Sequence, residues 1–170
     1  RDSFVNKLEK RLYMYDPEGG NTSSKKVQEV VYYCAEKLGV KLMVIDSLMK
    51  CGINEDDLNK QKSFANKLSV AARDLDIHIF LVAHSRKTAN ENDWANKFDV
   101  AGSANLTNLV DNVFSIHRNK AREEEVLNGS LDTEIMNQPP CSVYLLKQRH
   151  GRGIETRWGF GFKPETFSYT

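Results

Sequence analysis

The segment Lys41–Ser47, K-L-M-V-I-D-S, decides the fold class of this chain. Its apolar run is short and β-rich and follows a helical pattern that ends at Gly39, which is typical of a strand buried on both faces of a parallel sheet. Asp46 then stands at the carboxyl end of the strand, where open α/β sheets bind their ligands. A carboxylate in that position either holds the magnesium ion of a nucleotide or caps the following turn. The strand alone leaves both interpretations open.

The segments on either side of this strand predict an α/β domain. Upstream, Arg11–Asp16 is predicted as a short strand, residues 17–20 as a turn, and a helix begins at one of residues 21–24 and ends near Leu38. Downstream, the pattern predicts a loop (48–59), a helix (61–75), a buried strand (77–83) and a long polar loop (84–99). It then predicts a loop entering a short helix (100–110), a strand (112–117), a mobile surface excursion (120–140), a strand (141–147) and a terminal hairpin (156–162 with 166–169). Alternating strands and helices followed by a β-rich end are typical of a RecA-like core.

Composition limits the classes of function. A chain of 170 residues is long enough for a single domain with a sizeable core. Charged residues make up 28% and balance to a net charge of +1, so a nucleic-acid partner would have to be bound by a local basic cluster. Three cysteines without metal-ligand spacing predict a reducing, intracellular setting. No apolar run approaches the ~20 residues of a membrane span.

A phosphate-binding loop of the form G-x-x-x-x-G-K-S/T does not occur in the sequence. The glycines at 151 and 153, which lie beside arginines, do not replace it. Two interpretations follow from this absence. Either the chain is not a nucleotide-binding domain, or the first strand and its loop lie before residue 1 and the domain is truncated on its N-terminal side.

Four motifs in order favour the second interpretation. They are V-I-D-S-L at 44–48, L-V-A-H-S-R-K at 81–87, A-G-S-A-N-L-T-N-L-V-D-N-V-F-S-I-H-R-N at 101–119 and L-L-K-Q-R-H-G at 145–151. Together they resemble the Walker B strand, the strand ending in a phosphate-sensing His, the G-S-A block with its following strand, and the Lys-x-Arg arginine-finger segment of DnaB-type hexameric replicative helicases. The chain is most similar to the C-terminal half of the helicase core in the Twinkle-like and phage primase–helicase branches. The first motif alone is weak, since V-I-D-S occurs in many P-loop proteins.

The resemblance implies a fold, an activity and a set of partners. The fold is the C-terminal part of a RecA-like P-loop NTPase core, an α/β domain with a mainly parallel sheet flanked by helices and a C-terminal β-hairpin. The activity is that of an NTP-dependent DNA helicase that uses ATP, or another NTP, with Mg²⁺ and moves along single-stranded DNA as a homo-oligomeric ring, as a rule a hexamer. A primase is a further partner that the family suggests. The implied setting is intracellular, in a bacterium or a phage-infected host rather than a mitochondrion.

The resemblance also implies roles for particular residues. Asp46, with Ser47 beside it, would hold the nucleotide-bound Mg²⁺, and His84 would contact the γ-phosphate. Lys147 and Arg149 would enter the nucleotide site of the neighbouring subunit, and Arg118 would lie at the nucleotide or at the subunit contact. The residues alone favour a polar role at a strand end for His84, and Lys147 and Arg149 could be solvated cations on an edge strand.

The channel-facing loops of the family supply the candidate DNA contacts. These are four basic side chains that would bind phosphates and two residues that would offer backbone N–H groups, namely Lys50, Arg86, Lys87, Lys97, Gly102 and Ser103. One position departs from the phage relatives, which carry an arginine where this chain has Thr107. The catalytic glutamate of the family lies with the phosphate-binding loop, and the sequence contains no candidate for it.

Two alternatives remain at the level of sequence. The first is a RecA- or RadA-like recombination ATPase, which would need an aromatic- or glycine-rich channel loop after the third core strand. The second is a non-enzymatic module with a RecA-like fold that binds only DNA or a protein partner. The sequence upstream of residue 1 would discriminate between them, because an enzyme requires the phosphate-binding loop.

Overall fold

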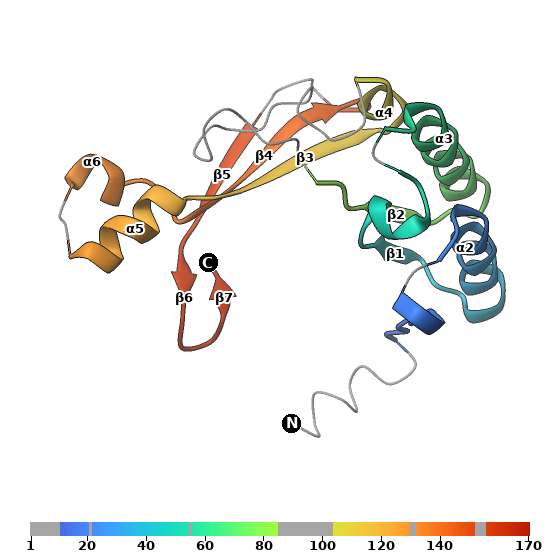
Figure 1. Cartoon of the computed structure of the whole chain (residues 1–170), viewed down its shortest axis with the longest axis horizontal. Coiled ribbons are helices and arrows are strands. Elements are labelled where there is room, and N and C mark those ends of the chain that lie inside the picture. The colour runs from blue at the N-terminus through green and yellow to red at the C-terminus, as the bar shows by residue number, and fades with distance from the viewer. Residues whose placement is uncertain (1–10, 21, 55, 85–103, 130–131, 152–155) are drawn as a thin grey trace.

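The computed structural model describes residues 11–20, 22–54, 56–84, 104–129, 132–151 and 156–170 (Figure 1). Its helices and strands are, in order, η1 (Glu18–Gly20), α2 (Ser24–Leu38), β1 (Leu42–Ile45), η2 (Leu48–Cys51), α3 (Leu58–Asp74), β2 (His78–Leu81), α4 (Ala104–Leu109), β3 (Asn112–Arg118), α5 (Lys120–Asn128), α6 (Thr133–Met136), β4 (Cys141–Gln148), β5 (Thr156–Phe160), β6 (Phe162–Lys163) and β7 (Ser168–Tyr169). The molecule is elongated: α2, α3, β1 and β2 lie at one end, and β3–β5 lead to α5 and α6 at the other (Figure 1). None of the described helices is long and apolar enough to cross a membrane.

Helix α2 begins and ends where the sequence predicts. The Ser23 hydroxyl accepts a hydrogen bond from the Lys26 amide at 3.1 Å, which satisfies one of the free N–H groups of the first turn. Gly39 ends the helix in the left-handed conformation, with φ of 67°. Val27 and Val31 point into the core and are 8% and 2% exposed. Local capping signals therefore fix both ends of this helix.

The segment before α2 differs from the prediction. Residues 18–20 form the expected turn, but Arg11–Asp16 pairs with no strand and is not itself one. A strand needs a neighbour to pair its backbone N–H and C=O groups, and an apolar sequence pattern does not supply that neighbour. Tyr13, Met14 and Tyr15 instead line a groove beside α2.

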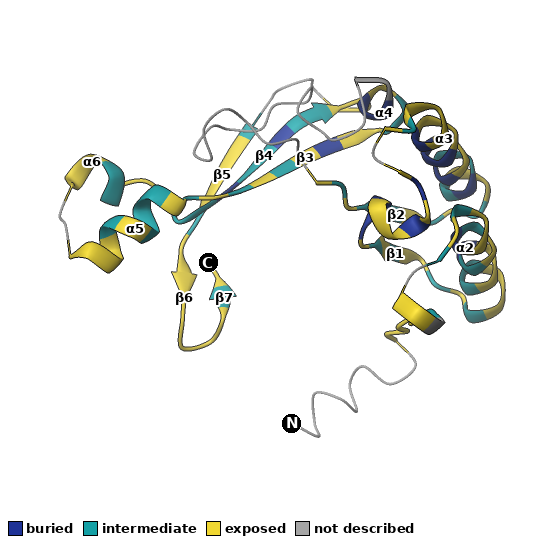
Figure 2. Cartoon of the chain, viewed as in Figure 1, coloured by how far each residue is buried: buried dark blue, intermediate teal, exposed yellow. Residues whose placement is uncertain are grey.

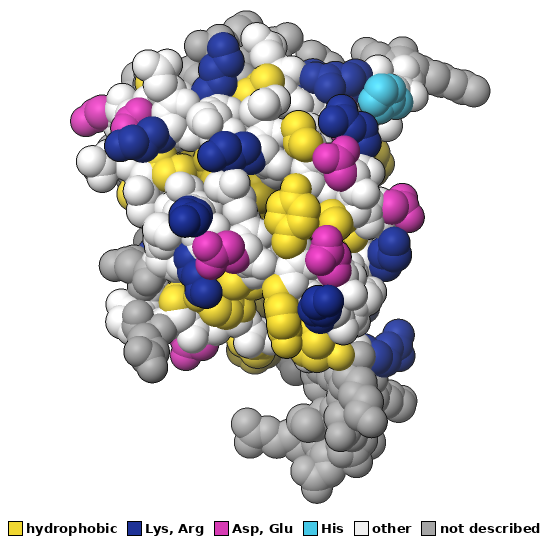
Figure 3. Space-filling model, turned by 90° about the vertical axis from the view of Figure 1, so that its right-hand side faces the viewer, with side chains coloured by type: hydrophobic (Ala, Val, Ile, Leu, Met, Phe, Trp, Pro, Cys, Tyr) yellow, Lys and Arg dark blue, Asp and Glu magenta, His cyan; other side chains and the backbone are white. Residues whose placement is uncertain are grey.

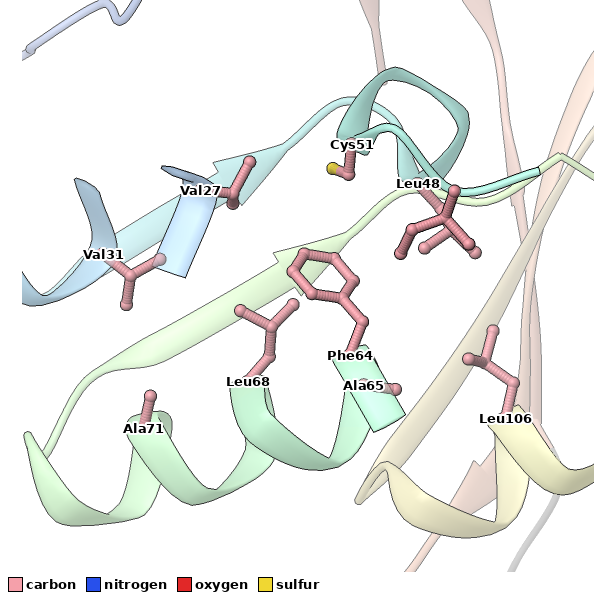
Figure 4. Packing of buried hydrophobic residues seen from close by; sticks show 10 residues of the cluster. Val27, Val31, Leu48, Cys51, Phe64, Ala65, Leu68, Ala71 and Leu106 are labelled. Carbon is pink, nitrogen blue, oxygen red and sulfur yellow. The ribbon is translucent and has the colours of Figure 1, made fainter. Parts of the chain in front are cut away.

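The hydrophobic core lies where α2, α3 and η2 meet (Figures 2 and 4). Helix α3 contributes Phe64, Leu68 and Ala71, which are 2%, 4% and 1% exposed and which the sequence predicts to face inward. Leu106 of α4 joins the same cluster. Full burial of a large apolar side chain contributes about 1.5–3 kcal/mol, so the burial of Leu106 holds α4 against this core.

The central strand pairs with its predicted neighbour but is not buried on both faces. Strands β1 and β2 are parallel, with Leu42 opposite His78 and Ile45 opposite Leu81. Burial alternates along β1: Met43 and Ile45 pack against the core, whereas Leu42 and Val44 are 56% and 64% exposed. Helices α2 and α3 lie on one side of this two-stranded sheet (Figure 1), and no described element buries the opposite side. The expectation of burial on both faces is therefore wrong for the described chain.

The remaining strands are antiparallel, so the expectation of a mainly parallel sheet is correct only for β1 and β2. Strands β3, β4 and β5 form a separate sheet in that order, and β6 pairs with β7. The chain leaves β3 and returns to β4 through two helices that lie beyond the same end of the sheet (Figure 1). Such a return makes neighbouring strands antiparallel, because a parallel pair needs a crossover to the opposite end.

Two further predictions about the C-terminal half need correction. The sequence predicts residues 120–140 as a mobile surface excursion, but their described part contains two helices, because Asn119 caps α5, Gly129 ends it and Asp132 caps α6. The terminal hairpin is shorter than expected. Most of the segment 156–162 pairs with β4 as β5, and the hairpin itself joins β6 to β7.

Candidate functional site

Asp46 lies at the carboxyl edge of the parallel strand pair. The ladder between the strands continues beyond their ends: the Val82 amide donates to the Ile45 carbonyl, and the Leu48 amide donates to the Val82 carbonyl, each at 2.9 Å. Asp46 stands between these two bonds, exposed, and forms no hydrogen bond or ion pair with any residue that the structure describes. The interpretation of Asp46 as a side-chain cap therefore has no support in the described contacts.

Ser47 is the buried residue that follows Asp46 at this edge of the sheet. It is 5% exposed, and its carbonyl accepts hydrogen bonds from the Lys50 amide at 2.9 Å and from the Cys51 thiol at 3.4 Å. These bonds close the first turn of η2, which follows Ser47 directly. Of the predicted pair, Asp46 is thus the residue whose side chain reaches solvent, while Ser47 fixes the backbone beside it.

His84 lies at the same edge of the sheet. It follows β2 by three residues, and because β1 and β2 are parallel, their carboxyl ends meet on one side. His84 is exposed, and no hydrogen bond or ion pair joins it to another described residue. The structure thus places Asp46 and His84 beyond the carboxyl ends of two neighbouring parallel strands. The alternative interpretation, a polar residue satisfied by hydrogen bonds at a strand end, therefore has no support among the described contacts.

One carboxylate at a strand end suits magnesium better than metals that need a complete protein cage. Among the described residues, no group of three or more His, Cys, Asp or Glu side chains converges to hold a metal ion. Mg²⁺ usually keeps several waters and binds one or two carboxylates together with substrate phosphates. The exposed Asp46 fits this mode of binding.

Lys147 lies in a second cluster, at the C-terminal end of α4. Its Nζ donates to the carbonyls of Thr107, Asn108 and Val110 at 2.8, 3.2 and 2.8 Å. The last carbonyls of a helix lack partners within it, and a cation favours their partial negative charge. Partial burial and the neighbouring Arg149 lower the pKa of Lys147. In this conformation Lys147 holds α4 to β4 through main-chain acceptors.

Arg149 binds the same turn from the end of β4. Its backbone N–H donates to the Asp111 carbonyl at 2.8 Å, while its guanidinium donates to Asp111 Oδ1 at 3.0 Å and to the Asn108 carbonyl at 2.8 Å. His150 Nε2 lies 3.5 Å from the same carboxylate oxygen. The side chain of Arg149 remains 42% exposed. Lys147 and Arg149, near the end of β4, thus both contact the residues that end α4 and are not solvated cations on an edge strand.

Arg118 lies at the opposite end of β3 from this cluster. Its guanidinium forms a two-bond ion pair with Glu123 of α5, Nε to Oε1 at 2.6 Å and Nη2 to Oε2 at 2.7 Å. Strand β3 places residues 112 and 118 about 20 Å apart at the usual rise per residue. Arg118 and Arg149 of one chain therefore do not share a site, and any common nucleotide site would need two chains.

Arg118 has an aromatic neighbour, Tyr169, that the sequence did not predict. The pKa of its guanidinium is raised mainly by Glu123 and to a smaller extent by the nearby Tyr169. Tyr169 packs against Phe162 across the terminal hairpin, with ring centroids 5.1 Å apart. The repeated aromatic residues near the C-terminus were the available signal, but the pairing of β6 with β7 was needed to place them together.

Of the six predicted DNA contacts, Lys50 alone lies among the described residues. Lys50 is exposed at the end of η2. The other candidates, Arg86, Lys87, Lys97, Gly102 and Ser103, lie outside the described residues, as does most of the predicted loop 84–99. On the face shown in Figure 3, Lys and Arg side chains are dispersed among acidic and apolar ones, and this mixed surface lacks the single-sign character of a phosphate-binding patch.

A groove of about 530 Å³ lies between the N-terminal segment and α2. Apolar and aromatic side chains, including Tyr13, Tyr15, Tyr33 and Leu38, form most of its wall. None of the predicted site residues lines it. The groove therefore has no part in the candidate nucleotide site.

Comparison with known proteins identifies the fold. No protein-family model and no curated protein sequence matches the chain. A DnaB-like replicative helicase, solved in a study of its interactions with primase, superposes with a TM-score of 0.73 and 14% identity over 99% of this chain and 40% of that one. The ATPase domain of a second helicase superposes with a TM-score of 0.66 and 16% identity over 88% and 51% of the two chains. The chain spans 40% and 51% of these two structures, and its fold is similar to the matching part of each, which agrees in part with the predicted RecA-like fold.

Proposed function

We propose that this chain is part of the ATP-driven core of a ring-forming replicative DNA helicase. The observation that carries the proposal is that Asp46 and His84 both stand just beyond the carboxyl ends of the parallel strands β1 and β2. In α/β sheets this edge is where nucleotides bind, and the fold is the one that helicase ATPase domains use. The sequence supplies the same two residues in the V-I-D-S and L-V-A-H motifs.

Each residue at this edge would have a definite task. Asp46 would hold a magnesium ion, which neutralises charge on the phosphates when bound. His84 would donate a hydrogen bond to the γ-phosphate and lose that partner after hydrolysis. Arg86 and Lys87 follow His84 by two and three residues in the sequence, so a change at His84 would be passed to basic side chains suited to the phosphates of single-stranded DNA.

The proposal of a ring rests on the position of Arg149. Arg149 is anchored to the end of α4, and no hydrogen bond or ion pair of the described structure joins it to Asp46. A head-to-tail contact between identical subunits joins two different surfaces, and such contacts form a ring where the rotation between subunits closes. In such a contact Arg149 of one subunit would bind the phosphates next to Asp46 of its neighbour. An arginine supplied to a phosphoryl-transfer site contributes about 10³–10⁵-fold in rate.

The partners and the setting follow from the same proposal. The ring would enclose single-stranded DNA, and a primase is a reasonable partner because the DnaB-like structure was studied with one. A bacterial cell or a phage-infected host would provide both. These partners are tested with the full-length protein rather than with the domain alone.

The direct test is hydrolysis of ATP by the full-length protein with and without single-stranded DNA. We expect DNA-stimulated turnover and unwinding of a forked duplex, both abolished by Asp46→Asn. Asp76→Asn is the matched control, because Asp76 is an exposed carboxylate at the opposite, amino-terminal end of the strands, where it pairs with Lys41. Turnover of the Asp46→Asn protein at the level of the control would refute the assignment of the edge.

A further inference from the structure

The turn that ends α4 gathers three basic side chains. Lys147, Arg149 and His150 all approach main-chain or carboxylate oxygens of residues 107–111. Within this turn Asp111 offers the side-chain carboxylate. It binds Arg149 twice, through its backbone carbonyl at 2.8 Å and through Oδ1 at 3.0 Å. The backbone and the guanidinium of Arg149 are therefore both held by Asp111.

The contacts leave the guanidinium free to bind a further anion. A guanidinium carries several N–H donors in a fixed planar fork, and the described contacts use one donor for Asp111 and one for the Asn108 carbonyl. The side chain of Arg149 is 42% exposed and that of Asp111 is 49% exposed. An arginine that keeps unused N–H donors while its side chain is partly exposed is suited to bind a phosphate as well.

Holding matters because an arginine side chain is long and flexible. An exposed arginine samples many rotamers, and fixing it costs free energy each time it binds. A contact that is already in place before the phosphate arrives removes part of that cost. The backbone bond to the Asp111 carbonyl fixes the base of the side chain, and the carboxylate fixes its tip.

We propose that Asp111 is a positioning residue for Arg149, holding its guanidinium in the orientation that reaches the nucleotide of the neighbouring subunit. This inference rests on the proposed function, because it assigns Asp111 a part in the same intersubunit site. His150 shares the carboxylate at 3.5 Å and is a weaker competitor for it. Asp111 itself does not touch the nucleotide.

The test compares Asp111→Asn with Asp74→Asn in the full-length protein. Asp74 is a matched control: its carboxylate, 52% exposed, also pairs with an arginine, Arg73, but at the end of α3. Asp111→Asn should lower kcat by about 10- to 100-fold with little change in KM for ATP, the loss typical of a misplaced reacting group. Ring assembly should persist, and Asp74→Asn should match the unmodified protein.

A second measurement separates positioning from a general structural role. Single-turnover hydrolysis is compared for Arg149→Ala alone and combined with Asp111→Asn. If Asp111 acts through Arg149, the double variant is no slower than Arg149→Ala, because residues that act as a unit are not additive. An additional loss in the double variant would indicate a structural role and overturn the inference. Should Asp111→Asn not assemble, Asp111→Ser is judged by the same criteria.

The outcomes also distinguish this inference from the proposed function. If Arg149→Ala loses turnover while Asp111→Asn retains the kcat of the Asp74→Asn control, the positioning role is wrong and the ring ATPase stands. If Arg149→Ala itself keeps full turnover, the intersubunit site is wrong, and the role of Asp111 falls with it.

Discussion

Replacing Lys147 with methionine should loosen α4, because the substitution removes the ammonium and keeps the apolar stem. The lost contacts are the three bonds from Nζ to the carbonyls of Thr107, Asn108 and Val110. Two of these three bonds are partly buried and one is exposed. Counting about 1 kcal/mol for each partly buried bond and little for the exposed one, the loss is about 2 kcal/mol.

Hydrogen exchange of the full-length protein measures this loss locally. A decrease of about 2 kcal/mol in the free energy of opening corresponds to about 30-fold faster exchange of the amides of α4 and of the end of β4. Lys41→Met is the control, since Nζ of Lys41 also donates to a carbonyl, that of Asp76, but is 68% exposed. Little change is expected there.

The same variant separates two roles of Lys147. If it mainly fixes α4, ATP turnover should fall less than in Arg149→Ala, because a lysine is a point charge without the planar fork of arginine. Unchanged protection of α4 together with a loss of turnover as large as that of Arg149→Ala would refute this reasoning. Lys147 would then act on phosphate and not on the helix.

Three further predictions concern other parts of the molecule. His84→Ala should leave ATP binding nearly intact and remove the stimulation of hydrolysis by DNA, as measured by nucleotide titration and steady-state turnover; lost binding with retained stimulation would make His84 structural. Burial and the positive charge of Arg157 lower the pKa of His117 below its ordinary value of 6.5, so the unfolded chain binds this proton more readily and stability should fall as the pH drops below about 6.5. Urea unfolding of His117→Gln should show a shallower decrease over that range, and an unaltered slope would count against the assignment. Phe64→Ala, at a position 2% exposed, should cost about 3–5 kcal/mol in the same assay, whereas Val44→Ala on the exposed sheet face should cost far less.

Features set by nearby residues could be predicted from the sequence. Helix α2 is an example: Ser23 and Gly39 fix its ends within the segment itself. Strand β1 and the position of Asp46 at its carboxyl end followed in the same way from a short apolar run. The caps of α5 were equally visible as Asn119 and Gly129, but the polar composition between them favoured an irregular excursion.

Features set by distant residues could not be predicted. Lys147 and its acceptor Thr107 are 40 positions apart, and their contact depends on how β3 and β4 pair, which no local pattern specifies. For the same reason Asp111 was not recognised as the partner of Arg149. The burial of Leu42 and Val44 depends on which elements cover the sheet, and an apolar strand looks the same in sequence whether one face is covered or both.

The most direct test of the central claim is ATP hydrolysis by rings that mix two inactive subunits. Arg149→Ala subunits keep Asp46, and Asp46→Asn subunits keep Arg149, so an interface with the first as pocket and the second as arginine donor is complete. Each pure variant should be inactive while still binding its neighbours. In a random equal blend about a quarter of the interfaces would be complete, as expected for a head-to-tail ring, and turnover should reappear. Full turnover of the pure Arg149→Ala protein would contradict the account.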